Sequence, residues 1–172
     1  ELNVSVVINK VDESKALNSL HESFFLSDTK ELHLFMVGVG LIGSTLLNQI
    51  QQQNAFLKDN SQLQIKVIGI SNSRKMVFNE NGINLESWRD DLLNSNDKAD
   101  ISTFIEEMKT LNLSNTIFVD NTANSAITSH YEKILDSSIS ISTPNKIATS
   151  SAYLQYERLK YIAKKRGVQF LY

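Results

Sequence analysis

The stretch LHLFMVGVGLIG, residues 32–43, decides which fold we expect for this chain. Its first part, Leu32–Gly38, is almost continuously apolar, which is typical of a parallel strand that is covered on both faces. A glycine-rich turn follows directly, and Leu46, Leu47 and Ile50 then recur on one face of a helix. A buried strand, a tight turn and a helix in this order predict the opening unit of an α/β domain.

Strands and helices alternate along the rest of the chain. After the helix, which we expect to end among residues 51–54, apolar or alternating runs predict strands at 65–71, 116–120, 138–142 and 168–172. Helical spacing predicts helices at 101–111, 126–135 and 152–165, and a short helix around Trp88 inside a loop at 72–99. This alternation predicts a doubly wound, mainly parallel sheet with helices on both faces and right-handed crossovers.

The first residues have a different pattern. Val4, Val6 and Ile8 alternate with Ser5 and Asn9 as in a half-buried strand, and residues 16–24 carry apolar side chains at helical spacing. One strand and one helix cannot enclose a core, so we expect segment 1–26 to need a partner or to dock on the remainder. The polar residues 27–31 predict a linker, followed by a domain at 32–172.

Composition and charge exclude several classes of function. A formal net charge of −2 gives no reason to expect nucleic acid or an anionic membrane as a partner. The chain has no cysteine, which excludes disulfides and thiolate metal sites, and His21, His33 and His130 lack metal-ligand spacing, so we expect no metal. No apolar run approaches the roughly 18 residues of a membrane helix. Because no signal peptide is visible either, we expect a cytoplasmic protein.

The glycines of the turn form the pattern G-x-G-x-x-G between a strand and a helix. In this pattern the first glycine allows the tight turn, the second lets the backbone approach a pyrophosphate, and the third lets the helix pack close to the strand. Free N–H groups at the start of the helix favour a diphosphate. We therefore expect a dinucleotide to contact Gly38, Val39, Gly40, Leu41, Ile42 and Gly43. The alternative is a glycine-rich turn that binds nothing.

The end of the second buried strand bears on the choice of cofactor. An acidic residue there would bind the adenosine ribose hydroxyls of NAD, but Asn72, Ser73, Arg74 and Lys75 follow Ser71 instead. A guanidinium, an ammonium and a hydroxyl can all bind a 2′-phosphate. A solvated basic loop is the alternative interpretation. The sequence favours NADP over NAD, with NAD as the second option.

Two further strands end in small polar residues, and ligands of open α/β sheets bind beyond such strand ends. In the first of these segments, Thr122 is placed to contact the nicotinamide half of a cofactor, although Thr122 or Asn124 could equally cap the next helix. In the second, Lys146 follows Pro144, the only proline, near a helix start where the dipole disfavours a cation. We expect Lys146 to bind a ribose hydroxyl or the reacting oxygen; a solvent-facing lysine is the alternative.

Five stretches together resemble the NAD(P)-binding domain of homoserine dehydrogenase in the same order and spacing. They are GVGLIG (38–43), ISNSRK (70–75), GINLESWRDDL (82–92), VDNTAN (119–124) and TPNKIA (143–148). The combination of VDNT with TPNK is more specific than the glycine motif alone. The likeness covers residues 32–172 and is strongest to bifunctional aspartokinase–homoserine dehydrogenases, and segment 1–26 resembles the last strand and helix of an ACT regulatory domain.

The resemblance implies a Rossmann-type fold and the reversible, NAD(P)-dependent interconversion of L-homoserine and L-aspartate 4-semialdehyde, in the route to threonine and methionine. Carried over to this sequence, residues 38–43 hold the pyrophosphate, and Asn72, Ser73 and Arg74 hold the adenosine side. Thr122 lies near the nicotinamide half. Lys146 lies by the nicotinamide ribose and the substrate hydroxyl and is the candidate catalytic residue. A homo-oligomeric parent protein is also implied.

In this family the groups that bind homoserine and relay its proton, and the region that forms the dimer, follow the segment matched here. We therefore expect the chain to be a piece of a longer enzyme and to be inactive by itself. Homoserine-dependent formation of NADPH by the purified chain would contradict that expectation. Two other functions stay open: an oxidoreductase of the same fold that acts on another semialdehyde or hydroxy acid, and a non-catalytic nucleotide-sensing module.

Overall fold

The computed structural model of the protein describes residues 3–13, 16–17, 20, 29–150 and 153–172. Within these residues, six strands form one sheet in the order β3-β2-β1-β4-β5-β6. The strands are β1 (Lys30–Val37), β2 (Leu63–Ser71), β3 (Met76–Phe78), β4 (Thr116–Asp120), β5 (Ser140–Ser142) and β6 (Phe170–Leu171). All neighbours pair in parallel except β3, which pairs antiparallel with β2 at the edge. The predicted doubly wound, mainly parallel sheet is confirmed, and its strand order reverses between β1 and β4.

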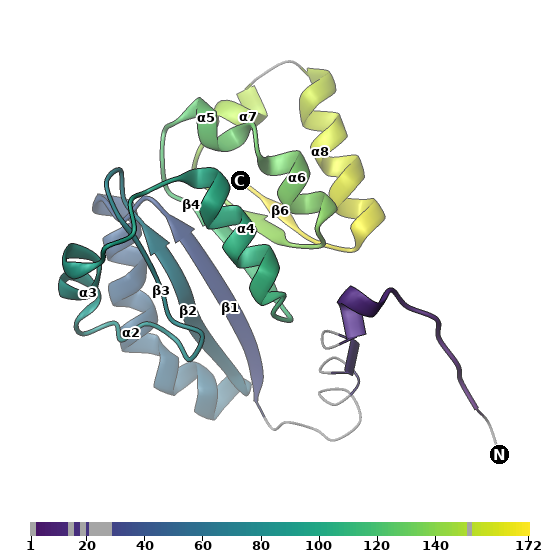
Figure 1. The fold of residues 1–172 in the computed structure, drawn as a ribbon, viewed down its shortest axis with the longest axis horizontal. Helices are drawn as coiled ribbons and strands as arrows, with labels where there is room; N and C mark the ends of the chain where they lie inside the picture. Colours follow the sequence, from purple (N-terminus) through teal and green to yellow (C-terminus); the bar gives the residue numbers. More distant parts are fainter. Residues whose placement is uncertain (1–2, 14–15, 18–19, 21–28, 151–152) are drawn as a thin grey trace.

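Helices cover both faces of the sheet. They are α2 (Leu41–Ser61), α3 (Trp88–Asn94), α4 (Ile101–Leu111), α5 (Ser125–Thr128), α6 (Tyr131–Asp136), α7 (Ile147–Ser150) and α8 (Tyr153–Arg166). A short 3-10 helix, η1 (Lys10–Asp12), belongs to the N-terminal segment. In Figure 1, α4 lies in front of the sheet, and α2 lies behind it. The spacing of Phe104, Ile105 and Met108 predicted α4 with the bounds that the structure has, because these apolar residues make one fully buried helix face.

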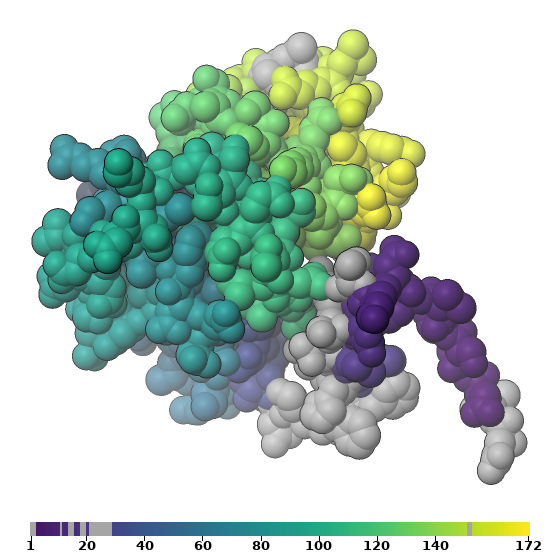
Figure 2. All heavy atoms as spheres, in the orientation of Figure 1, coloured from purple at the N-terminus to yellow at the C-terminus, as the bar shows by residue number. Residues whose placement is uncertain are grey.

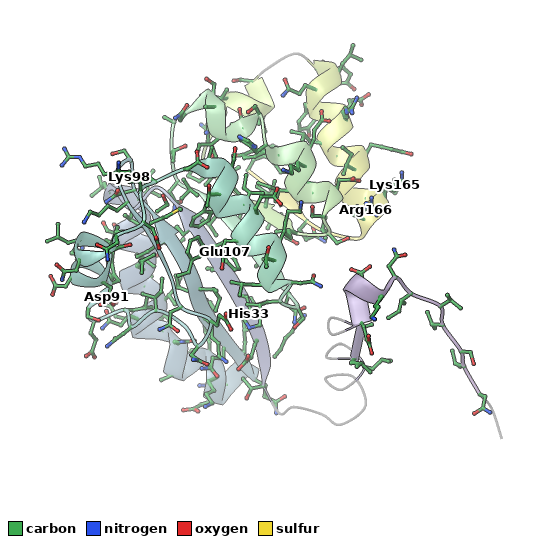
Figure 3. The ribbon with its side chains drawn as sticks, viewed as in Figure 1. His33, Asp91, Lys98, Glu107, Lys165 and Arg166 are labelled. Atoms are coloured by element: carbon green, nitrogen blue, oxygen red, sulfur yellow. The ribbon has the colours of Figure 1, made fainter. Side chains whose placement is uncertain are left out.

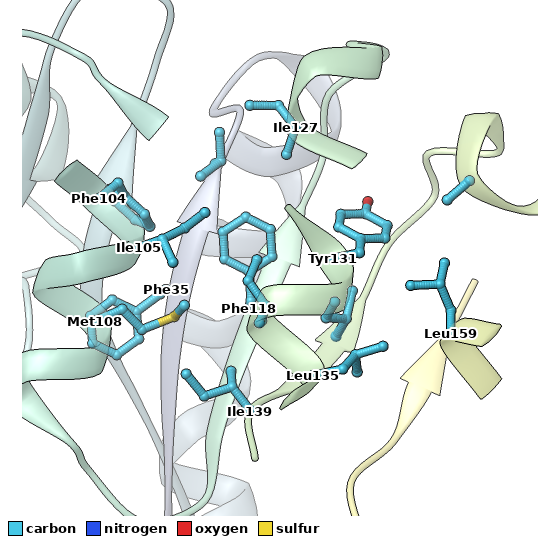
Figure 4. Close-up of a cluster of buried hydrophobic side chains, with 14 of the residues drawn as sticks. Phe35, Phe104, Ile105, Met108, Phe118, Ile127, Tyr131, Leu135, Ile139 and Leu159 are labelled. Atoms are coloured by element: carbon cyan, nitrogen blue, oxygen red, sulfur yellow. The ribbon is translucent and has the colours of Figure 1, made fainter. Parts of the chain in front are cut away.

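The alternation of side chains along β1 divides the core into two clusters. Phe35 and Val37 point to one face of the sheet, where they pack with residues of α4, α6 and α8. Leu34 and Met36 point to the other face, where they pack with α2 and α3. Figure 4 shows the first cluster, with Phe118 near its middle and the Tyr131 hydroxyl at its margin. Both faces of β1 are therefore buried, which explains its continuously apolar sequence.

The N-terminal segment does not form the predicted strand. Residues 3–9 belong to no strand, and Val4, Val6 and Val7 are all exposed. Figure 2 shows this segment extending away from the body of the molecule. Alternating side chains stabilise a strand only when a neighbouring strand supplies hydrogen-bond partners, and the described part of the sheet supplies none here. The predicted helix is formed at the described residues 13, 16, 17 and 20, while the rest of that helix and most of the linker lie outside the described residues.

Two predicted boundaries were wrong. The linker at 27–31 overlaps β1, which already begins at Lys30. Helix α2 does not end among residues 51–54 but continues to Ser61. The polar run at 51–54 suggested a helix end, but the Asn54 amide instead bonds the backbone N–H and C=O of Ile65 at 2.9 and 3.0 Å. A polar side chain thus joins α2 to β2 in the middle of the helix.

The remaining differences concern short elements. Strand β3 lies in the segment predicted as a loop, and three residues are too few for alternation to reveal a strand. The helix predicted at 126–135 is divided into α5 and α6, because the Thr128 and Ser129 hydroxyls bond backbone carbonyls of the preceding turn. Helix α8 matches the predicted long helix, and α7 precedes it as an additional turn.

Candidate functional site

The glycine-rich turn is held against the neighbouring strand ends by close backbone contacts. Gly38 has φ +90°, a conformation that side chains disfavour, and its N–H donates to the carbonyl of Ser71 at 2.8 Å. A Cβ added at Gly38 would lie 2.8 Å from Thr122 Cγ2 and 3.0 Å from the Asn121 carbonyl carbon. The turn between β1 and α2 therefore packs directly on the loop that follows β4.

The other two glycines of the motif have different surroundings. A Cβ at Gly43 would lie only 2.0 Å from the Gly38 carbonyl oxygen, so the helix start packs on the turn more closely than any side chain permits. At Gly40 nothing lies within 4 Å of the same position. No side chain caps α2 at Gly40, and its first turn holds no acidic residue. The backbone N–H groups at this helix start are thus left for a ligand, and the dipole favours an anionic one.

A cleft of about 760 Å³ opens beside this turn, at the carboxyl ends of β1, β2 and β4. This position beside the reversal of strand order is where ligands of open α/β sheets bind. Six of the predicted site residues line the cleft: Gly38, Val39, Gly40, Asn72, Ser73 and Thr122. The structure thus brings together residues from three separate segments of the sequence.

The other predicted site residues lie outside this lining. The side chains of Leu41 and Ile42 are exposed, and Gly43 is buried beneath the turn, so these positions offer backbone rather than side-chain groups. Arg74 is exposed on the loop next to Ser73. Lys146 is exposed and directly precedes α7. Its neighbour Asn145 is hydrogen-bonded at 3.4 Å to the carbonyl of Asn124, which does line the cleft.

Asn72 shapes the basic loop after β2. Its side-chain oxygen accepts hydrogen bonds from the backbone N–H groups of Arg74 and Lys75, at 2.7 and 2.8 Å. Lys75 is not itself a lining residue; its ammonium donates to the carbonyl of Leu93, a residue near the end of α3 that does line the cleft. Of the two basic residues in the loop, only Arg74 therefore keeps a charge directed to solvent near Ser73.

Helix α3 forms the far wall of the cleft, although the sequence motifs did not predict that its residues belong to the site. Trp88 is 4% exposed, and the guanidinium carbon of Arg89 lies 4.4 Å from the centroid of its ring. Both residues line the cleft together with Asn72 and Ser73. The adjacent Trp and Arg were visible in the sequence, but only the fold shows that this pair lines the same cleft as the loop after β2.

A buried polar network lies behind the cleft, around the fully buried carboxylate of Asp120 at the end of β4. Oδ1 accepts from the Thr122 backbone N–H at 2.8 Å, and Oδ2 accepts from the Tyr131 hydroxyl at 2.6 Å and from Asn145 Nδ2 at 3.0 Å. The Thr143 hydroxyl donates to the Asp120 carbonyl at 2.7 Å. Burial, followed by the bond to Asp120, raises the pKa of Tyr131 far above its ordinary value. Tyr131 therefore remains a hydrogen-bond donor.

Arg89 and Asp90, which we did not assign to the site, also line the cleft, whereas other unassigned charged residues lie outside its lining. Figure 3 shows Asp91 on α3, Glu107 on α4 and His33 on β1. Asp91 and Glu107 are exposed, and His33 is buried with its Nδ1 2.6 Å from the carbonyl oxygen of Ser114. Within the described ranges, no three His, Cys, Asp or Glu residues are grouped as a metal site would need. No described helix is long and apolar enough to cross a membrane.

Comparison with known proteins assigns this arrangement to a known type. Residues 38–172 match the family model described as "Homoserine dehydrogenase, NAD binding domain". The chain is 40% identical over its whole length to the bifunctional aspartokinase/homoserine dehydrogenase 2, chloroplastic, of Arabidopsis thaliana, and 31% identical over its whole length to the bifunctional enzyme of Haemophilus influenzae. It spans 19% and 21% of the lengths of these relatives, so the match concerns about a fifth of each.

Solved structures with the same fold include two informative ones. A protein of unknown function from Candida auris superposes with a TM-score of 0.70 at 25% identity, over 84% of this chain and 38% of that one. A hyperthermophilic archaeal homoserine dehydrogenase in complex with NADPH superposes with a TM-score of 0.65 at 19% identity, over 83% of this chain and 44% of that one. The second likeness, at its low identity, concerns the fold alone.

Proposed function

The chain belongs to the homoserine dehydrogenase family through its NAD-binding domain, and on that premise we propose that its cleft holds the nicotinamide dinucleotide of such an enzyme. The reaction proposed for the whole protein is the reversible, NAD(P)-dependent interconversion of L-homoserine and L-aspartate 4-semialdehyde. One observation carries the proposal: the cleft combines the uncapped start of α2 with polar residues from the ends of β2 and β4.

The fit of the diphosphate depends on the backbone of the turn. Because Gly40 has open space where a Cβ would be, a phosphate can approach the N–H groups that follow it. The absence of a capping side chain and of acidic residues in the first turn leaves those groups to the ligand. Residues 38–43 would therefore hold the diphosphate through main-chain donors, and the exposed side chains of Leu41 and Ile42 would remain outside.

The bound cofactor would supply a nicotinamide ring that accepts or donates a hydride. Thr122, on the loop packed against Gly38, is the residue proposed to lie near that half of the cofactor. Lys146 is proposed as the catalytic residue, with its ammonium on the nicotinamide ribose and the substrate oxygen. A cation that donates a hydrogen bond to this oxygen stabilises the negative charge that develops there.

A preference for NADP(H) over NAD(H) is the finer part of the proposal. No acidic residue ends β2, and Ser73 and Arg74 are both exposed there. Arg89 adds a second guanidinium, and it lines the cleft together with Asn72, Ser73 and the acidic Asp90. Guanidinium groups and hydroxyls suit a 2′-phosphate, and a carboxylate would repel one. One structurally similar protein was solved with NADPH, which is consistent with this choice.

The decisive test is the Gly40→Asp variant, titrated with NADPH and NADH. A carboxylate at this position would repel a bound diphosphate, and we expect at least about a tenfold loss of affinity. Ala55→Asp is the matched control, because it adds the same charge to an exposed position farther along α2. Equal affinity of the wild type and Gly40→Asp would exclude the glycine turn as the diphosphate site.

A cytoplasmic location and a homo-oligomeric state of the whole protein belong to the same proposal. The plant relatives are named as chloroplastic, so location differs among relatives of similar sequence. Analytical ultracentrifugation of the whole protein would test the oligomeric state, and a sedimenting monomer would contradict it.

A further inference from the structure

The carboxylate of Asp120 divides its hydrogen bonds between two loops. One oxygen accepts from Thr122 N–H, on the loop that packs against the glycine turn. The other oxygen accepts from Asn145 Nδ2, on the segment that leads to Lys146, and from the hydroxyl of Tyr131 on α6. Asp120 is fully buried and forms no ion pair within the described part of the chain. Neutral donors alone satisfy it.

The segment around Lys146 is fixed from both sides although its side chain is exposed. Before it, the Asn145 N–H donates to the Thr143 hydroxyl oxygen at 2.9 Å. After it, the Ile147 N–H donates to the Asn145 side-chain oxygen at 3.1 Å. The Asn145 amide thus binds Asp120 with its nitrogen and the backbone beyond Lys146 with its oxygen. The position of the lysine backbone therefore depends on the Asp120 carboxylate.

We propose that Asp120 is a positioning residue that couples the Thr122 loop to the Lys146 loop, so that both are set for one bound dinucleotide. This inference rests on the proposed function, because it assumes that Lys146 contacts the cofactor. A buried carboxylate is costly unless donors surround it, and an apolar residue would pack as well without that cost. The two oxygens instead hold two cofactor-facing loops at a fixed separation, which reduces the ordering that binding would otherwise require.

The variant Asp120→Asn tests this role with almost no change in shape. One side-chain oxygen remains for the Thr122 N–H, but an NH₂ group now faces the Asn145 NH₂ group, and two donors cannot bond. Asn145→Asp combined with Asp120→Asn reverses the donor and the acceptor and restores the bond. The double swap also keeps the wild-type net charge and leaves an oxygen of residue 145 for the Ile147 N–H.

The experiment is a titration of the ¹⁵N-labelled 172-residue chain with NADPH, followed by NMR. We expect Asp120→Asn and Lys146→Ala each to weaken binding by about tenfold, and their combination to weaken it no further, because both remove the same contact. The swap should return the affinity to within about threefold of wild type. Hydrogen exchange of the Ile147 amide should become faster in Asp120→Asn and slow again in the swap. Glu107→Gln, which changes an exposed carboxylate on α4, is the control that should change nothing.

The outcomes separate this inference from the proposed function. If the wild-type chain binds NADPH and Gly40→Asp does not alter the affinity, the proposed cofactor site fails. If Gly40→Asp behaves as expected but the losses from Asp120→Asn and Lys146→Ala add in full, the coupling role alone is overturned. If Lys146→Ala has no effect, the proposed contact of Lys146 with the cofactor fails together with the coupling role. Should Asp120→Asn not fold, Tyr131→Phe removes one donor to the same oxygen and keeps the ring. If the coupling exists, the loss of NADPH affinity in Tyr131→Phe must not add to the loss in Lys146→Ala.

Discussion

Two sides of the candidate site are held in place by opposite means. The glycine turn after β1 is fixed by backbone contacts: Gly43 packs on the Gly38 carbonyl, and Gly38 packs on the Asn121 carbonyl. The loops after β4 and β5 are fixed by side chains, through the Asp120 carboxylate and its donors from Tyr131 and Asn145. The glycine turn is therefore sensitive to added volume, and the loops after β4 and β5 are sensitive to a change of hydrogen-bonding groups.

The largest effect should follow from adding volume to the backbone-built side. A methyl group at Gly43 would lie 2.0 Å from the Gly38 carbonyl oxygen, so the start of α2 must move away from the turn. We expect Gly43→Ala to lower the free energy of unfolding by about 3 kcal/mol or more. Gly40→Ala, with nothing within 4 Å, is the matched control and should stay near wild-type stability. Urea denaturation of the three proteins measures this, and equal stabilities would show that the turn is not tightly packed.

The side-chain-built side should instead be sensitive to alkaline pH. Because burial and the bond to Asp120 raise the pKa of Tyr131, the folded protein keeps this proton at pH values where the unfolded chain has lost it. The stabilisation is complete below about pH 10, the ordinary value for tyrosine, and is lost as the pH rises further. We expect the free energy of unfolding of the wild type to fall by up to about 1.4 kcal/mol per pH unit more steeply than that of Tyr131→Phe.

Stability curves between pH 8 and pH 11 would measure this difference. Tyr161→Phe is a suitable control, since Tyr161 is an exposed tyrosine on α8. Parallel curves for wild type and Tyr131→Phe would mean that the Tyr131 hydroxyl is not enclosed as the structure has it.

The same contrast explains how much could be predicted from sequence. The turn and α4 were predictable, because glycine spacing and apolar periodicity lie within a few consecutive residues. The Asp120 network was not, because its side-chain partners Tyr131 and Asn145 are 11 and 25 residues away and meet only when β4, α6 and the loop after β5 pack together. In the N-terminal segment the pattern was present without the strand, since alternation cannot supply a pairing partner.

We expect the smallest effect from substitutions in α3, which forms the wall of the cleft at the proposed adenosine end of the cofactor. The Arg89 guanidinium lies over the Trp88 ring, and Arg89 lines the cleft together with Asn72 and Ser73. Arg74, which is exposed as Arg89 is, has no such ring beneath it among the described residues and lies outside the cleft lining. A stacked guanidinium loses less freedom on binding a phosphate than a free one does. We therefore expect Arg89→Ala to weaken NADPH binding by about five- to tenfold, and Arg74→Ala by less, with NADH binding changed little by either.

Isothermal titration of both cofactors against wild type, Arg89→Ala, Arg89→Lys and Arg74→Ala separates the contributions. Arg89→Lys keeps the charge but loses the planar fork that stacks on Trp88 and binds phosphate oxygens in pairs, so it should recover only part of the affinity. If Arg74→Ala alone removed the preference for NADPH, the exposed loop and not the stacked pair would select the cofactor. The adenosine end of the cofactor would then be bound by a residue outside the cleft lining, whereas the glycine turn and the loop after β4 would bind through residues of that lining.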